Sequence, residues 1–368
     1  MASLHELNRL GQSVWLDFID RNLLSNGGLA RLVEGGVTGV TTNPTIFHKA
    51  ITGSADYDAS IRALIERDPG MSAEQVTEAL MVADVQAAAD VLRGVYQRTG
   101  AADGYVSLEV PPDLAFDARQ TVRMAHQLWK AVDRPNVMIK VPGTREGVEA
   151  FEALTADGIN VNVTLLFAVS RYEEVVRAWV RGLARAARPQ TLASVASFFV
   201  SRVDGKVDKQ LDAIGTTQAQ GLRGRIAVAN AKLAYERFQV LRRDPAVAAL
   251  LRQGVPVQRP LWASTSTKNP AYRDVLYVET LVGPDTVNTL PPETLDAFVD
   301  HGEARSSIAQ DMVSVHGDLA ALRGLGIDLD AITAQLEREG VASFADSWQK
   351  LVEGVAAKCT QVAGARAR

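Results

Sequence analysis

The chain has 368 residues, of which 47% are hydrophobic and 22% charged, and its formal net charge is −4. These fractions are typical of a folded globular protein, and a chain of this length buries a large core without disulfides or metals. Lysine and arginine are scattered along the sequence. The charge pattern therefore argues against a general binder of nucleic acids or of anionic membranes.

The single cysteine, Cys359, excludes a disulfide framework or a cysteine-based metal site within the chain. Residues 1–10 lack the long apolar segment of a signal peptide. No later segment reaches the roughly 18 consecutive apolar residues that a membrane-spanning helix needs. We therefore expect a cytoplasmic protein in a reducing compartment, with neither a membrane nor a nucleic acid as its partner.

Eight short apolar or β-rich runs recur along the chain, with helical stretches between them. The runs are residues 13–19, 36–42, 104–110, 136–142, 159–166, 191–199, 259–265 and 285–291. Such alternation is typical of a parallel sheet with helical crossovers. The number of runs, and the absence of a glycine-rich dinucleotide turn after the first, favour a single parallel (β/α)8 barrel over a doubly wound open sheet.

Helical patterns fill the gaps between the runs. We expect Asn26 to cap a helix over residues 27–36 and Thr144 to cap one over residues 145–158. Two connections exceed the needs of a barrel and indicate helical insertions, near 44–103 and 203–258. Amphipathic helices are expected near 293–360. We interpret residues 1–368 as one barrel domain with helical insertions and C-terminal helices.

Polar residues stand inside these runs or at their ends, although a strand covered on both faces is expected to be apolar. In the fifth run Asn160, Asn162 and Thr164 share one parity, so their side chains should point into the barrel. Three further polar residues lie near the ends of the first three runs: Asp17, Asn43 and Glu109. Each alone is more often a turn former or a helix cap. Together they predict a polar cluster at the C-terminal mouth, where barrel enzymes have their active sites.

Lys140 lies between Ile139 and Val141 in the fourth run and should point into the barrel. Burial of an unpaired ammonium is costly, so this lysine either forms a structural ion pair with Glu109 or Asp17 or has a chemical role. Desolvation favours the neutral amine, which condenses with ketones. The protonated Schiff base then accepts the electrons released when an adjacent carbon–carbon bond breaks. Asp17 or Glu109 could move the proton of the substrate hydroxyl.

Five segments, in this order and spacing, resemble the transaldolases of the longer bacterial type: GVTGVTTNPTIF, YVSLEV, VMIKVPGTREGVEAF, INVNVTLLF and ASFFVSRVDGKVD. The similarity extends from about residue 12 to about residue 300. It implies a (β/α)8 class I aldolase of the pentose phosphate pathway that uses no metal or organic cofactor. Such an enzyme moves a dihydroxyacetone unit from sedoheptulose 7-phosphate to glyceraldehyde 3-phosphate, giving erythrose 4-phosphate and fructose 6-phosphate.

The resemblance also implies roles for the residues that match the reacting groups of the family. Lys140 matches the Schiff-base lysine, and Asp17 matches the general acid/base. Glu109 and Thr164 match the pair that holds a catalytic water.

Other matching residues would bind the substrate. Asn43 and Asn162 match amides that bind hydroxyls of the three-carbon unit, while Ser197 and Phe199 match residues lining the same pocket.

For the phosphate, Arg202 matches a binding arginine and Ser264 a binding serine. The family pattern has an arginine two residues after that serine, where this chain has Ser266. We expect Lys268 to replace it, assisted by the hydroxyl of Ser264 or Ser266.

Two alternatives are compatible with the sequence. One is an enzyme like fructose 6-phosphate aldolase, which releases free dihydroxyacetone with the same lysine. The other is a catalytically silent barrel that binds sugar phosphates or a partner protein, although such a binder gains nothing from a buried amine. In each case the expected partners are small sugar phosphates, and a homodimer is the assembly to test.

Overall fold

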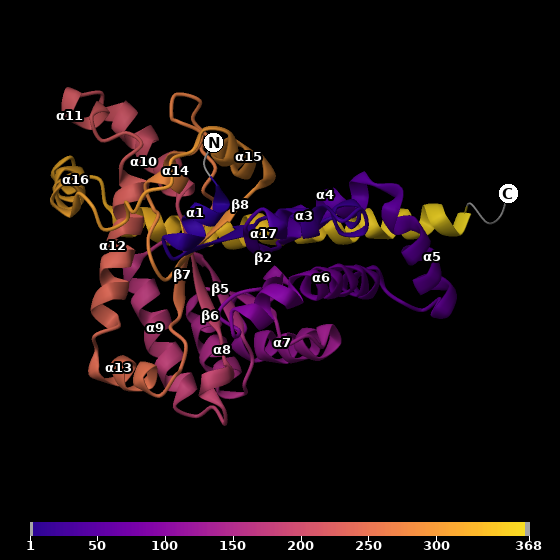
Figure 1. Ribbon diagram of the computed structural model, residues 1–368. Helices are drawn as coiled ribbons and strands as arrows, with labels where there is room; N and C mark the ends of the chain where they lie inside the picture. Colours follow the sequence, from indigo (N-terminus) through magenta and orange to yellow (C-terminus); the bar gives the residue numbers. More distant parts are fainter. Residues whose placement is uncertain (1–2, 365–368) are drawn as a thin grey trace.

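The computed structural model describes residues 3–364 and contains a closed barrel of eight parallel strands in sequence order (Figure 1). The strands are β1 (Gln12–Leu16), β2 (Val37–Thr41), β3 (Val106–Glu109), β4 (Val137–Pro142), β5 (Val161–Leu166), β6 (Ser194–Phe199), β7 (Arg259–Ala263) and β8 (Thr286–Leu290). Each overlaps one of the predicted runs, and β1 pairs with β8 to close the barrel. The predicted (β/α)8 barrel is confirmed, and the open sheet is excluded.

The register of the central strands brings polar residues together. All residues of β3, β4 and β5 are buried, as expected for strands covered on both faces. Lys140 of β4 is paired in register with Glu109 of β3 on one side and with Asn162 of β5 on the other. Because side chains alternate between the two faces of a strand, these three share the inner face.

Short helices precede, follow or connect the strands. They are α1 (Leu4–Arg9), α2 (Arg21–Ser25), α3 (Gly28–Glu34), α7 (Ala118–Val132), α8 (Arg145–Ala156), α9 (Val169–Leu183) and α14 (Leu276–Glu279), with 3-10 turns η1 (Ala55–Tyr57), η2 (Pro112–Leu114) and η3 (Pro189–Thr191). Thr144 caps α8 as predicted, since its hydroxyl accepts the Gly147 amide at 3.0 Å. The predicted cap of α3 is wrong by one residue. Gly27 holds the cap position, and Asn26 ends α2 while its side chain accepts the Gly28 amide.

Both predicted insertions are helical. Residues 44–103 contain α4 (Pro44–Gly53), α5 (Asp58–Arg67) and α6 (Ala73–Arg98). Residues 203–258 contain most of α10 (Ser201–Ile214), followed by α11 (Thr217–Gln220), α12 (Ile226–Leu241) and α13 (Pro245–Arg252).

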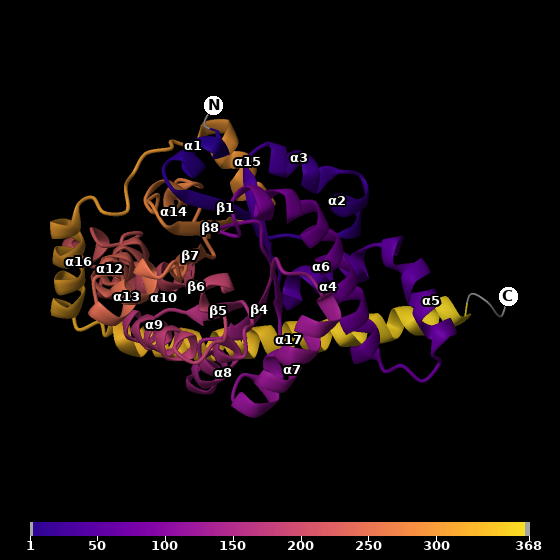
Figure 2. The same ribbon diagram turned by 60° about the horizontal axis from the view of Figure 1, so that its bottom comes forward.

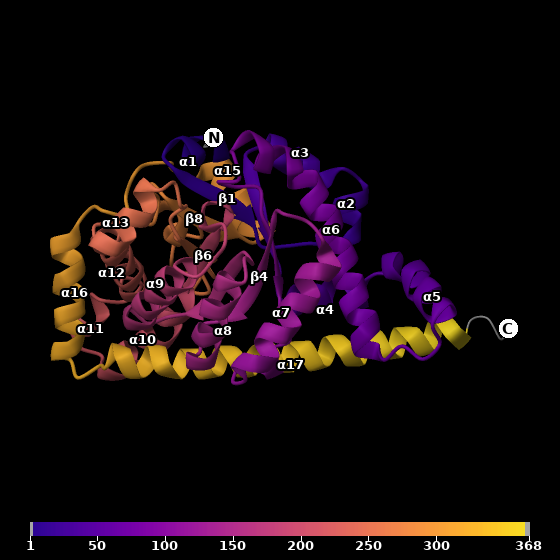
Figure 3. The ribbon, with the colours of Figure 1, turned by 90° about the horizontal axis from the view of Figure 1, so that it is seen from below.

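The C-terminal region forms α15 (Pro292–His301), α16 (Met312–Gly324) and α17 (Leu329–Gly364), as predicted. The 36 residues of α17 make one long helix that runs across the whole molecule (Figure 3). It contacts α10, β5, η2, α4 and α5, and Figure 2 shows α16 and α5 near its opposite ends. Because α10, η2 and α4 directly follow β6, β3 and β2, α17 lies on the C-terminal side of the barrel.

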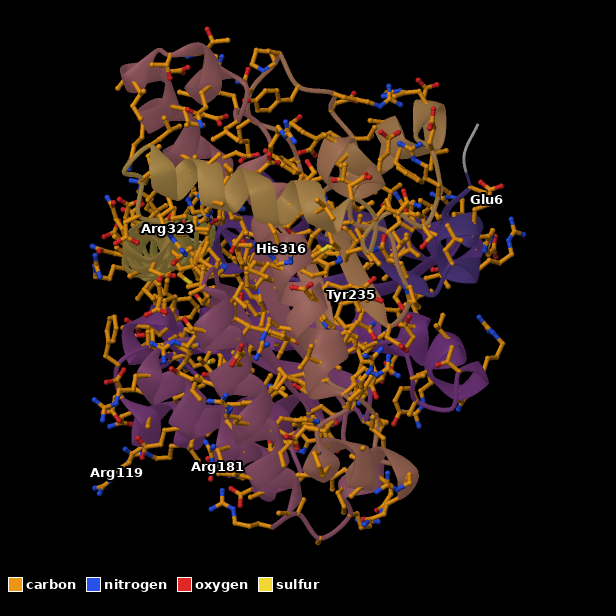
Figure 4. All side chains as sticks on the ribbon, turned by 90° about the vertical axis from the view of Figure 1, so that its left-hand side faces the viewer. Glu6, Arg119, Arg181, Tyr235, His316 and Arg323 are labelled. Carbon is orange, nitrogen blue, oxygen red and sulfur yellow. The ribbon has the colours of Figure 1, made fainter. Side chains whose placement is uncertain are left out.

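Charged side chains cover the outer helices (Figure 4). Arg119 and Arg181 are exposed at the periphery, and His316 of α16 lies 3.2 Å from Glu236 of α12. Within residues 3–364, no helix has both the length and the apolar character required to cross a membrane.

Candidate active site

Lys140 lies inside the barrel beside a carboxyl group. Its side chain is only 6% exposed, and its Nζ lies 3.3 Å from Glu109 Oε2 and donates to the Thr42 carbonyl at 2.9 Å. The ion pair that the sequence left open as a structural alternative is therefore present. Burial raises the pKa of Glu109, although the charge of Lys140 opposes this effect. A carboxylate with a raised pKa is a better proton acceptor, so Glu109 can take the proton that an amine loses before it attacks a carbonyl.

Asp17 follows β1 at the mouth of the barrel and is half-buried. Its Oδ1 accepts a hydrogen bond from Thr41 Oγ1 at 2.6 Å, and Thr41 Oγ1 also lies 2.6 Å from Thr289 Oγ1. Burial raises the pKa of Asp17, whereas the Lys140 charge and the Thr41 hydrogen bond lower it and the Glu293 charge raises it. The carboxyl group thus lies within electrostatic reach of Lys140 and can move a proton on a molecule bound there.

Asn162 is the centre of a second polar group, formed by β3, β5 and β6. Its Nδ2 donates to Ser107 Oγ at 3.0 Å, and its Oδ1 accepts from Ser197 Oγ at 2.6 Å. All three side chains are buried. The two hydrogen bonds fix the orientation of the amide and leave one of its N–H groups for a ligand. Sequence reasoning missed Ser107, although its parity with Glu109 places both on the inner face of β3.

Thr164 occupies an irregular part of β5. The register shifts between Val163 and Leu166, and Leu165 has a φ of +59°. Such a bulge redirects side chains at the rim of a barrel. The hydroxyl of Thr164 is buried and has no hydrogen-bond partner among residues 3–364. Since buried hydroxyls almost always have a partner, this one is suited to hold a water or a ligand atom.

Asn43 caps α4, because its Oδ1 accepts the Ile46 amide at 3.0 Å. The interpretation of Asn43 as a helix cap is therefore correct for its oxygen. Its Nδ2 makes no hydrogen bond within the described part of the chain and can still donate to a ligand.

Asn160 does not belong to the polar cluster at the mouth, so this expectation is wrong. It precedes β5, and its Nδ2 donates to the carbonyls of Pro135 at 3.1 Å and Val137 at 3.2 Å. These residues precede or begin β4, so Asn160 ties neighbouring strands together at the opposite end of the barrel. The alternation of the fifth run predicts the inner face but not the depth within the barrel.

Arg202 is the second residue of α10 and is half-buried, with aromatic rings near its guanidinium. Its Cζ lies 5.3 Å from the centroid of Phe199 and 5.9 Å from that of Phe344. Burial lowers the pKa of Arg202, although the charge of Glu339 opposes this effect, and across residues 3–364 the guanidinium has neither an ion pair nor a hydrogen bond. A partly desolvated guanidinium with no directly paired carboxylate is suited to bind a phosphate.

Ser264 and Lys268 lie after β7. Ser264 has a φ of +56°, which is uncommon for a residue with a side chain, and its Oγ lies 2.9 Å from Ser201 Oγ. Lys268 is exposed, and its Nζ donates to Ser266 Oγ at 2.7 Å. The charge of Lys268 lowers the pKa of Asp17. Lys268 therefore acts electrostatically on the mouth of the barrel, and among residues 3–364 it forms no hydrogen bond with Arg202 or Ser264.

These features define a class of protein. A closed parallel barrel holds a buried lysine on a central strand, with two carboxyl groups near it whose pKa values are raised by burial. This is the arrangement of a lysine-centred barrel enzyme. Among residues 3–364 there is no cluster of three or more His, Cys, Asp or Glu side chains arranged to bind a metal.

Comparison with known proteins identifies the family. The family model described as "Transaldolase/Fructose-6-phosphate aldolase" matches residues 14–355. "Transaldolase 1" of Streptomyces coelicolor is 48% identical over 360 residues, which cover 96% of this chain and 94% of that protein. "Transaldolase" of Frankia alni is 47% identical over 363 residues, which cover 96% of each chain. "Transaldolase" of Thiobacillus denitrificans is 47% identical over 352 residues, which cover 94% of this chain and 98% of that protein. The chain belongs to the transaldolase/fructose-6-phosphate aldolase family, and the resemblance based on the five segments is confirmed.

Proposed function

We propose that the chain is a transaldolase of the pentose phosphate pathway that works through a Schiff base on Lys140. The observation that carries the proposal is the buried pair of Lys140 and Glu109, 3.3 Å apart inside the barrel. A pair of this kind is costly to bury, and it supplies both a nucleophile and a proton acceptor. The names and the high identity of the relatives support the same function.

In the proposed reaction, Lys140 attacks the C2 carbonyl of a ketose phosphate while Glu109 accepts the amine proton. The carbinolamine loses water, which Glu109 and the free hydroxyl of Thr164 hold, and an iminium ion forms. Asp17 then removes the C4 hydroxyl proton, and the electrons of the C3–C4 bond flow into the iminium as an aldehyde leaves. The remaining enamine attacks the acceptor aldehyde, Asp17 returns its proton, and water releases the product ketose.

The polar groups around the lysine fit a three-carbon polyol. The amides of Asn162 and Asn43 and the hydroxyl of Ser197 can hydrogen-bond its hydroxyls without adding charge. The ring centroid of Phe199 lies 5.3 Å from that of Phe167 and 5.3 Å from Arg202 Cζ, and we assign this ring to the lining of the same pocket. We assign the phosphate of the substrate to Arg202, Ser264 and Lys268.

The product pattern separates this function from its alternatives. With fructose 6-phosphate and erythrose 4-phosphate we expect sedoheptulose 7-phosphate and glyceraldehyde 3-phosphate, and little free dihydroxyacetone when the acceptor is omitted. Release of dihydroxyacetone at the same rate with and without acceptor would identify a fructose 6-phosphate aldolase instead. Binding without any product would identify a silent barrel.

Replacement of Arg202 by alanine is expected to raise KM for fructose 6-phosphate by roughly 10- to 150-fold, the usual worth of a charge-assisted contact. The reaction with unphosphorylated fructose should change little. Arg181→Ala is the control, because Arg181 is an exposed arginine paired with Glu152 on the outer surface. Equal losses with both sugars would exclude Arg202 from the phosphate site.

The pH profile should respond to two charges near Asp17 in opposite directions. Asp17 must be ionised to accept the hydroxyl proton, so kcat/KM for cleavage should fall as the pH drops through the pKa of Asp17. The Lys268 charge lowers this pKa and the Glu293 charge raises it. Lys268→Gln should therefore move the acidic limb to higher pH, and Glu293→Gln should move it to lower pH.

The profile is best measured with fructose at low ionic strength, because the missing phosphate removes the ionisation of the substrate and low salt preserves the interaction with exposed charges. Shifts in the same direction for both variants would show that Asp17 is not the base.

The charge of the substrates indicates where the enzyme works. Sugar phosphates carry about two negative charges and do not cross membranes, which supports a cytoplasmic enzyme. For the assembly we propose a homodimer, with light scattering in solution as its test.

A further inference from the structure

The loop that follows β7, residues 264–275, contains two of the proposed phosphate ligands, Ser264 and Lys268. Hydrogen bonds hold the start of this loop in place. The Ser264 carbonyl accepts the Ser201 amide at 3.0 Å, in addition to the contact between the two hydroxyls. The Thr265 hydroxyl lies 3.0 Å from Asn288 Oδ1 and 3.2 Å from the Thr289 carbonyl and shares its one proton between these two acceptors. The first two residues are thereby fixed to α10 and β8.

The far end of the loop is bound to α10 by two aspartates one helical turn apart. Asp208 Oδ2 accepts the Tyr272 hydroxyl at 2.6 Å, and Asp204 Oδ2 accepts the Tyr277 hydroxyl at 2.8 Å. The other oxygen of each carboxyl group accepts a backbone amide, that of Gly224 at 3.2 Å or of Ala227 at 2.7 Å. Both aspartates are buried, and burial raises the pKa of Asp204 to about 7.

Tyr272 is also held sterically. Gly224 has a φ of +70°, and a Cβ at this position would lie 2.8 Å from Cζ of the Tyr272 ring. The ring therefore packs directly on the glycine backbone, in a space that only glycine provides. Gly224 is itself bonded to α10 through Asp208, so the hydroxyl and the ring of Tyr272 are both held by groups attached to that helix.

Lys268 lies between the two fastened ends. It shares a cavity of about 350 Å³ with Ser201, Asp208 and Tyr272. Its own hydrogen bond goes to Ser266 within the loop, so its position relative to α10 depends on how the ends are held. Arg202 is on that same helix, less than two turns before Asp208.

We propose that Tyr272 and Asp208 are positioning residues for phosphate recognition: their hydrogen bond sets the place of Lys268 relative to Arg202. This inference rests on the proposed function, because it assumes that Lys268 and Arg202 bind the substrate phosphate together. It assigns selectivity for phosphorylated sugars to a contact between α10 and the loop that follows β7. A purely structural role of the same pair would affect folding stability but not the preference between substrates.

Tyr272→Phe tests the proposal, since it deletes the hydroxyl and keeps the ring on Gly224. We expect KM for fructose 6-phosphate to rise roughly 3- to 10-fold, the usual range for loss of one hydrogen bond, with kcat and the reaction of unphosphorylated fructose unchanged. Tyr172→Phe is the matched control. Tyr172 is a buried tyrosine of α9 whose hydroxyl has no hydrogen-bond partner within residues 3–364, so deleting that hydroxyl should leave KM unchanged.

A double-mutant cycle with Lys268→Gln decides how Tyr272 acts. If Tyr272 works through Lys268, the Tyr272→Phe change should have almost no effect on KM once Lys268 is replaced. Additive effects, or an equal loss with fructose, would overturn the proposal.

Titration with inorganic phosphate provides a readout that does not depend on turnover. The proposal predicts weaker binding in Tyr272→Phe than in the wild type or in Tyr172→Phe. If the wild type binds phosphate in this pattern but does not transfer, the proposed function fails and the positioning role stands. If the wild type transfers normally and Tyr272→Phe binds phosphate like the wild type, the positioning role alone fails.

Discussion

Replacement of Lys140 by methionine is expected to abolish transfer, lowering kcat by on the order of 10⁴-fold or more, as when the nucleophile of a covalent enzyme is deleted. Methionine fills a similar volume but cannot form an imine. The protein should still fold, because burial raises the pKa of Glu109 and favours its neutral form once the cation is gone. Circular dichroism and the transfer assay on the same sample are the measurements.

Lys232→Met is the matched control for this variant. Lys232 is also a buried lysine, but it belongs to α12, outside the barrel. Burial lowers the pKa of Lys232, and its Nζ donates to the Gln310 carbonyl at 3.0 Å. Comparison of the two variants therefore separates the effect of losing any buried amine from the effect of losing the nucleophile. Full activity of Lys140→Met would contradict the proposed mechanism, and so would loss of transfer in a folded Lys232→Met variant.

Asp17→Asn is expected to slow carbon–carbon cleavage by about 10²- to 10⁴-fold, the usual contribution of a positioned acid/base. Asparagine keeps the shape and can still accept the Thr41 hydrogen bond, but it cannot take up the hydroxyl proton. Formation of the Schiff base should persist, because Lys140 and Glu109 are unchanged. Single-turnover measurements of adduct formation and of aldehyde release separate the two steps.

Asp20→Asn provides the matched control, three residues further along the same loop. Asp20 caps α2 by accepting the Leu23 amide at 2.6 Å, and asparagine caps helices equally well. This variant should keep nearly the wild-type rate. If Asp17→Asn lost adduct formation while cleavage of the residual adduct stayed normal, Asp17 would have a different role.

The barrel could be predicted because each strand is a short apolar run bounded by helical patterns, a local signal of the sequence. The depth of a residue within the barrel is not local. Asn160 and Asn162 share a parity, yet one joins strand backbones while the other holds Ser107 and Ser197. Depth depends on the stagger between neighbouring strands, which alternation does not encode.

The lysine of the candidate site could be predicted from physical chemistry alone, since burial of an amine inside an apolar strand is costly unless the amine has a partner or a chemical role. Only some of the residues around this lysine could be predicted. The alternation of β3 indicated Ser107. Thr289, which contacts the Thr41 hydroxyl, and Glu293, whose charge acts on Asp17, reach this part of the site only because β8 closes the barrel against β1. Tyr272 and Asp208 are 64 residues apart in sequence, and no local sequence pattern at either residue predicts their contact. Ordinary tyrosines and helix aspartates acquire a role only through tertiary structure.

Reduction with borohydride in the presence of fructose 6-phosphate, followed by peptide mass spectrometry, tests the central claim most directly. Reduction converts the Schiff base into a stable amine and records which lysine formed it. We predict a three-carbon adduct on Lys140 that is absent from Lys140→Met and unchanged in Lys232→Met. An adduct on Lys232 or on any other lysine, or an active enzyme that yields no adduct, would contradict the assignment of Lys140 as the nucleophile.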